Sequence, residues 1–162
     1  MLVLLIMIIM PVFWITTRAG GTAITQPLPF SHAVHVEEND MECADCHVRV
    51  ADHPRATIPE LSVCQECHFD ALTESELESE LLAYTTQDRA IPWRRIYAVP
   101  DHVYFSHRRH ITLGRLACET CHGQVGSFDT PPPAAVVPIS MDGCMGCHRE
   151  MQITNDCLAC HR

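Results

Sequence analysis

The chain has 162 residues, a formal net charge of −9, ten cysteines, eleven histidines and no lysine. The negative charge argues against nucleic acid as a partner, because binding to phosphates requires a basic surface. It favours a small basic protein, or a basic patch on a larger subunit, as the partner. The length suits one compact domain with a small core.

Residues 1–17 form an almost unbroken apolar run, and Arg18 is the first charged residue. This length is close to the minimum for a helix that spans a bilayer, and it also fits a signal-peptide core. Trp14 and Arg18 are typical of the interfacial edge of a membrane helix. We therefore predict an N-terminal membrane anchor helix over 1–17 and a linker over 18–29. A cleaved signal peptide and a buried helix are the alternatives.

Every cysteine belongs to a Cys-x-x-Cys-His motif, and the motif occurs five times. The copies are Cys43/Cys46/His47, Cys64/Cys67/His68, Cys118/Cys121/His122, Cys144/Cys147/His148 and Cys157/Cys160/His161. Two thiols at this spacing can add to the two vinyl groups of one haem, and the adjacent histidine is then aimed at the iron. The pattern predicts five covalently bound c-type haems, held by the ten cysteines, with the five histidines as proximal iron ligands.

Zinc and disulfides explain the motifs less well. Zinc ribbons need cysteine pairs in twos to supply four ligands, and they do not require a histidine after every second cysteine. Five pairs is an odd number, and a histidine follows each of them. The motifs therefore favour haem.

So many haems leave little room for a conventional core. Apolar side chains are expected to pack against the porphyrins, and the thioether bonds to cross-link the chain as disulfides do in other small domains. Eleven prolines and few long apolar-periodic stretches agree with low regular structure. The predicted fold class is mainly irregular with short α-helices, with one multihaem (class III-like) domain over 30–162 behind the N-terminal transmembrane helix.

Residues 30–35 and 105–110 share the pattern Phe-Ser-His-x-x-His, and in both copies the first histidine precedes the next haem motif by the same spacing. This order resembles the cytochrome c3 and c7 families. The resemblance implies that the first histidine is the distal ligand of the haem that follows, and that the second reaches a different haem. It predicts internal repeats over 30–68 and 105–148.

Six histidines remain after the proximal ones: His32, His35, His53, His102, His107 and His110. The repeat assigns His32 to the first haem and His107 to the third. We allocate His53 to the second haem, and expect His35 and His110 to cross to haems elsewhere in the chain. His102 is then spare, and we expect it to hydrogen-bond to a propionate or a backbone group.

One late haem has methionine as an alternative distal ligand. Phe128 stands where the second half would need a counterpart of His53. The candidates are Met141, Met145 and Met151. A thioether ligand would raise that haem's potential, although packing is the commoner role of a methionine.

An insertion over 71–104 separates the repeats. Residues 72–85 read as a helix, because Thr73 or Ser75 can cap it and glutamates occupy its early turns. A solvated acidic helix is the expectation, and a docking face for a basic partner is the alternative. Residues 91–105 contain two prolines and are expected to be extended. Pro131 begins a stiff spacer before the last two haems, which should be neighbours in space.

The insertion carries the most specific resemblance. Pro92-Trp93-x-Arg95, followed by residues 100–110 as Pro-Asp-His-Val-Tyr-Phe-Ser-His-x-x-His, resembles the pentahaem cytochrome c subunit of bacterial alternative complex III. With the apolar N-terminus and the haem motifs, the resemblance covers nearly the whole chain. It implies a single-pass subunit in the inner (cytoplasmic) membrane, with the haem domain in the periplasm, and a hetero-oligomeric complex that oxidises quinol in respiration or photosynthesis.

The same resemblance implies the partners. They are an iron-sulfur and molybdopterin-like subunit, polytopic quinone-binding subunits and a monohaem cytochrome c. Electrons from menaquinol would then pass through the five haems toward a periplasmic acceptor. Arg94 and Arg95 are candidates for contacts with haem propionates or with a neighbouring subunit.

Two other functions fit the sequence less well. A multihaem reductase of nitrite or hydroxylamine needs an open iron position, and often a lysine as proximal ligand. This chain has no lysine and at least as many spare histidines as irons. A membrane-anchored quinol dehydrogenase of the tetrahaem type usually has four haems. We therefore predict an electron-transfer subunit without catalytic residues of its own.

Overall fold

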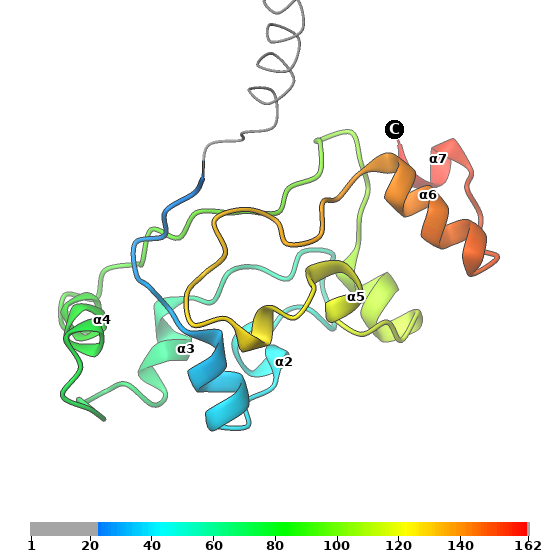
Figure 1. Ribbon diagram of the computed structural model, residues 1–162. Coiled ribbons are helices and arrows are strands. Elements are labelled where there is room, and N and C mark those ends of the chain that lie inside the picture. The colour runs from blue at the N-terminus through cyan, green and yellow to red at the C-terminus, as the bar shows by residue number, and fades with distance from the viewer. Residues whose placement is uncertain (1–22, 162) are drawn as a thin grey trace, which may run out of the picture.

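The computed structural model describes residues 23–161, and within them the chain forms short helices joined by long irregular segments, without a β-strand (Figure 1). The helices are α2 (Cys43–Cys46), α3 (Leu61–Gln65), α4 (Glu76–Thr86), α5 (Glu119–His122), α6 (Met141–Glu150) and α7 (Cys157–Cys160). Single π-helical turns occur at η1 (Val34–Glu38) and η2 (Arg109–Leu113), and a 3-10 turn at η3 (Val125–Ser127). The prediction of a mainly irregular chain with short helices is confirmed.

The predicted anchor over 1–17 and the first part of the linker lie outside the described residues. Between residues 23 and 161, none of the helices combines the length and the apolar character that crossing a bilayer requires.

Two extended segments, 90–104 and 129–140, run along the same side of the molecule (Figure 1). The Tyr97 hydroxyl in the first segment accepts a hydrogen bond from the backbone N–H of Val136 in the second (2.9 Å). Prolines interrupt both segments, so side-chain contacts of this kind replace a regular ladder.

Buried apolar side chains are scarce. Of the residues that the structure describes, only Leu28, Ala33, Leu61 and Ile91 are buried hydrophobics, and no side chain is fully buried. Leu28, Leu61 and Ile91 form a cluster. The cluster joins the segment before η1, helix α3 and the start of the extended segment 90–104. Many large apolar side chains are exposed, including Phe69 (73%). This composition is expected where haem faces provide the packing surface.

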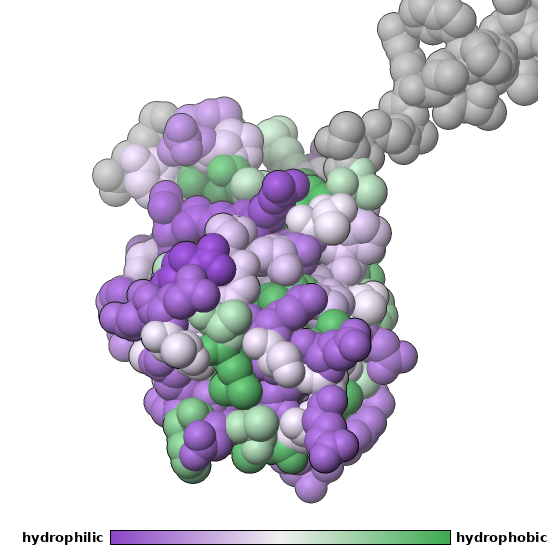
Figure 2. All heavy atoms as spheres, turned by 90° about the vertical axis from the view of Figure 1, so that its left-hand side faces the viewer, coloured by the Kyte–Doolittle hydropathy of each residue, from purple (hydrophilic) through white to green (hydrophobic). Residues whose placement is uncertain are grey.

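The predicted acidic helix forms as α4, which begins at Glu76 rather than at residue 72. The Ser75 hydroxyl caps it by accepting a hydrogen bond from the Leu77 N–H (3.3 Å). The end of the molecule that carries α4 is mostly hydrophilic with smaller apolar groups among the polar ones (Figure 2). Most of the helix is solvated as expected, but Glu78 is buried.

Candidate haem-binding site

Each Cys-x-x-Cys-His motif folds into one helical turn. In four of the five, the N–H of the histidine donates to the carbonyl of the first cysteine, at 2.8 to 3.0 Å: His47 to Cys43, His68 to Cys64, His122 to Cys118 and His161 to Cys157. The remaining motif lies within α6. Positions i, i+3 and i+4 share one side of such a turn, so two thiols and an imidazole point the same way. None of the ten cysteines is paired in a disulfide, so each motif presents the groups that a c-type haem needs.

The two Phe-Ser-His-x-x-His segments have nearly the same local geometry. Phe30 lies edge-on to His32 (4.9 Å, 89°) and stacks on His35 (4.4 Å, 28°). Phe105 lies edge-on to His107 (4.8 Å, 89°) and stacks on His110 (4.6 Å, 26°). Each phenylalanine thus separates two imidazoles that face in different directions. One short segment can thereby serve two haems.

Three of the remaining histidines lie opposite proximal histidines at closely similar distances. The ring-centre distances are 6.2 Å for His35 and His68, 6.3 Å for His107 and His122, and 6.2 Å for His110 and His148. An iron held between two imidazoles by bonds of about 2 Å would place the ring centres roughly 6.3 Å apart, because each centre lies about 1.1 Å behind its ligating nitrogen. The spacing of all three pairs therefore fits an iron between the rings.

His102 also faces a proximal histidine, although the sequence-based allocation left it spare. Its ring centre lies 5.4 Å from that of His161, closer than in the three pairs above, and the two ring planes are 25° apart. The extended segment is held there by an isolated bridge between Val103 and His161 and by a hydrogen bond from the Tyr104 N–H to the Cys160 carbonyl (2.8 Å). The structure thus brings His102 to the fifth motif.

The structure places His53, which was allocated to the second haem, beside Asp52. Its Nδ1 is 2.6 Å from the Asp52 carboxylate, and the hydrogen bond between them lowers the pKa of Asp52. The imidazole beside the second motif is instead that of His35.

His32 lies near the first motif. Burial is the main cause that lowers the pKa of His32, and the nearby charge of His47 adds to it. Burial likewise lowers the pKa of His107 and of His122. Low pKa values favour the neutral imidazole, which is the form that binds metal.

The hydrogen bonds of the histidines test whether these residues suit haem iron. Five rings interact through Nδ1 with backbone carbonyl oxygens at 2.8 to 3.1 Å: His35 with Ser31, His47 with Thr57, His107 with Pro54, His110 with Ser106 and His148 with Thr154. A carbonyl only accepts, so Nδ1 carries the hydrogen and Nε2 keeps its lone pair. A metal-bound imidazole needs this tautomer, and the chain therefore fits the predicted cofactor.

The motifs follow one another in space in an order that differs from the sequence. Cysteines of neighbouring motifs lie close together in three places: Cys46 near Cys64, Cys43 near Cys118, and Cys121 near Cys147. The Asn155 side chain, just before α7, donates to the Met145 carbonyl of α6 (3.4 Å). Figure 1 shows the corresponding row of α3, α2, α5, α6 and α7. The second motif is at one end of this row and the fifth at the other.

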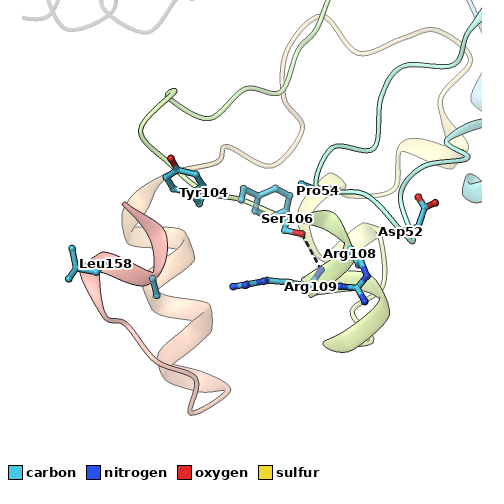
Figure 3. A pocket seen from close by; sticks show the side chains of 9 residues that line it. Asp52, Pro54, Tyr104, Ser106, Arg108, Arg109 and Leu158 are labelled. Carbon is cyan, nitrogen blue, oxygen red and sulfur yellow. Dashed lines mark hydrogen bonds between the residues drawn. The ribbon is translucent and has the colours of Figure 1, made fainter. Parts of the chain in front are cut away.

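A cavity of about 480 Å³ lies between α7 and the second repeat. Its lining includes Asp52, Tyr104, Arg108, Arg109 and Leu158. Figure 3 shows Arg109 extending from η2 toward the α7 side of this cavity. Arginine forms paired hydrogen bonds with carboxylates, so this side chain is suited to a haem propionate.

The late methionines contribute less to the site than the histidines do. Met141 and Met151 are exposed (62% and 42%), and the Met151 sulfur lies 3.8 Å from the Cys147 thiol. Both late motifs have an imidazole opposite their proximal histidine.

Comparisons with known proteins agree with this site. The family described as cytochrome c7 and related cytochrome c matches the chain twice, at residues 28–87 and 103–162. The multiheme cytochrome c subunit of menaquinone reductase from Nitratidesulfovibrio vulgaris (strain Hildenborough) is 31% identical over an alignment of 161 positions that covers 85% of this chain and 77% of that protein. The chain belongs to the cytochrome c7 and related cytochrome c family, and is a multihaem c-type cytochrome with covalently bound haem.

Proposed function

We propose that this chain is an electron-transfer subunit in which five haems are each closed on both sides by histidine. The proposed axial pairs are His32 with His47, His35 with His68, His107 with His122, His110 with His148, and His102 with His161. In this assignment His35 takes the place of His53 at the second haem. His102, which the sequence-based allocation left spare, serves the fifth haem. The supporting observation is that an imidazole lies 6.2 to 6.3 Å from the proximal histidine of the second, third and fourth motifs. His102 lies 5.4 Å from the proximal histidine of the fifth motif, and His32 lies near that of the first. Irons closed in this way exchange electrons and bind no substrate.

The spatial row of motifs supports conduction along the chain in the order second, first, third, fourth and fifth haem. The chain's own residues bind the haems, and backbone carbonyls hold Nδ1–H on five of the rings. They also bring neighbouring haems close, since two imidazoles separated by one phenylalanine serve different haems. The haems supply the one-electron couple.

We further propose that the row connects a menaquinone-reactive partner subunit with a periplasmic redox protein. The similar Nitratidesulfovibrio protein is named as a subunit of menaquinone reductase, whereas the resemblance to alternative complex III implies quinol oxidation. The partners are then iron-sulfur and polytopic quinone-binding subunits and a basic cytochrome c, to which a net charge of −9 is complementary. The direction of electron transfer between the quinone and the haems follows from one measurement on the detergent-purified complex. Either menaquinol reduces its haems, or a menaquinone analogue oxidises prereduced haems.

The carrier function predicts the spectrum of the holoprotein. Low-spin c-type haem should account for the whole reduced-minus-oxidised spectrum, and carbon monoxide should not bind, because no iron has an open position. Haem content and mass should both correspond to five haems per chain. A high-spin component, or carbon monoxide binding to native protein, would contradict closed ligation and favour an enzyme.

Residues 1–17 are proposed to anchor the haem domain to the outer face of the inner membrane, with 18–29 as the linker. Deleting 1–17 behind a cleavable export signal should release a soluble pentahaem protein into the periplasm, because residues 23–161, the part that the structure describes, hold no membrane-spanning helix. Fractionation of membranes and periplasm checks this. A truncated protein that stays in the membrane fraction when it is expressed without its partners would contradict the anchor.

A further inference from the structure

Glu78 is the only charged or polar side chain that is buried in the described part of the chain (8% exposed). It lies in α4, where the glutamates on either side of it, Glu76 and Glu80, are exposed. A solvated acidic helix does not explain a buried carboxylate, which needs compensating partners. The burial therefore points to a specific role.

The Glu78 carboxylate accepts four hydrogen bonds. Oε1 accepts from the Leu72 N–H (2.8 Å) and lies 2.9 Å from Nδ1 of His68. Oε2 accepts from the N–H and the hydroxyl of Thr73 (2.6 Å each). The Thr73 hydroxyl and the Leu72 N–H are the main causes that lower the pKa of Glu78 to about 2, and His68 contributes less. Both oxygens accept from N–H or O–H donors, and these bonds hold the carboxylate against the histidine of the second haem motif.

His68 differs in this respect from five other histidines of the proposed axial pairs. The five rings described above interact through Nδ1 with neutral backbone carbonyls. A carboxylate is a stronger, charge-assisted acceptor. It makes the imidazole a better donor to its metal, and such outer partners tune metal sites strongly. A more electron-rich ligand stabilises ferric over ferrous iron.

We propose that Glu78 is a positioning residue of the second haem, whose carboxylate accepts the Nδ1–H of His68 and makes this haem the last of the five to be reduced. The inference rests on haem ligation by His68 in the proposed function. The proton stays on Nδ1 in both oxidation states, so reduction of the iron takes up one electron and no proton. The second haem stands at one end of the row, and an electron that enters there passes to its neighbour with a favourable free energy.

The test compares Glu78→Gln with Glu80→Gln in the full-length holoprotein. Both variants lose one negative charge from α4, but only the first loses the carboxylate at His68. Glu78→Gln should raise the ratio of reduced to oxidised second haem at a fixed potential about tenfold, equivalent to roughly 59 mV for a one-electron couple. Glu80→Gln should leave it unchanged. Haem-methyl signals followed during a redox titration report each haem, and contacts of the thioether groups with Cys64 and Cys67 identify the second.

Thr73→Val provides a variant with the opposite expected sign. It removes the hydroxyl that donates a hydrogen bond to the Glu78 carboxylate. Glu78 then becomes a stronger acceptor for His68, and the second haem becomes harder to reduce. Equal shifts in both glutamate variants, no shift in Glu78→Gln, or a shift at another haem would overturn the role of Glu78. These results are distinct from failure of the proposed function, which would appear as high-spin iron in the unmodified protein.

Discussion

Replacing His102 by glycine should open the sixth coordination position of the fifth haem. One of the five haems would become high-spin in the ferric state and bind carbon monoxide when reduced. The ring centre of His102 lies 5.4 Å from that of His161, and removing the His102 ring leaves the backbone contacts of Val103 and Tyr104 in place. Electron paramagnetic resonance and carbon monoxide difference spectra measure the effect, which is a change of about one haem in five.

His53→Gly is the matched control for this variant. His53 contacts Asp52, so its loss should leave all haems low-spin. The opposite result, with carbon monoxide binding after loss of His53 and not of His102, would restore the allocation that follows from the sequence alone. A low-spin His102→Gly protein would show that another side chain, such as one of the late methionines, ligates the fifth haem.

Replacing His107 by methionine should raise the potential of the third haem selectively. The His107 ring lies 6.3 Å from that of His122 and is nearly parallel to it (7°). A thioether in its place stabilises ferrous iron, and the shift should be on the order of 0.1 V or more, since axial ligands span about 0.8 V. A spectroelectrochemical titration with the same haem-methyl signals measures it.

His32→Met is the corresponding variant of the first repeat, and its shift should fall on the first haem. If His107→Met changed the potential of a different haem, the pairing of His107 with His122 would be wrong. The two variants together therefore test whether equivalent positions of the repeat serve equivalent haems.

The sequence predicts local features of this chain well. Each Cys-x-x-Cys-His motif needs only one helical turn to aim two thiols and an imidazole in one direction, and the two phenylalanine-histidine segments repeat with nearly the same ring geometry. Neighbouring residues determine both features, so a spacing pattern is sufficient to find them.

The pairing of histidines could not be predicted in the same way. His102 reaches the fifth motif through a bridge between Val103 and His161, and no periodicity in an extended, proline-rich segment indicates that contact. His53 was allocated by elimination, but its loop folds toward the second repeat, where the Pro54 carbonyl accepts the N–H of His107 (2.9 Å). Both contacts join residues that are distant in sequence.

Glu78 was missed although the sequence holds a signal for it. Positions 78, 81, 82 and 85 lie on one side of a helix, and Leu81 and Leu82 make that side apolar. A single acid in an apolar stripe differs from the exposed glutamates around it. Its partner, His68, could be identified only from the fold.

The small apolar cluster of Leu28, Leu61 and Ile91 has a consequence for biogenesis. Such a cluster is too small to offset the conformational entropy of ordering a chain of this length. Attachment of the cofactors is therefore coupled to compaction, as metal binding is coupled to folding in other small metalloproteins. A polypeptide that has not yet been loaded would remain open to proteases, so proteolysis itself would select for completely matured molecules.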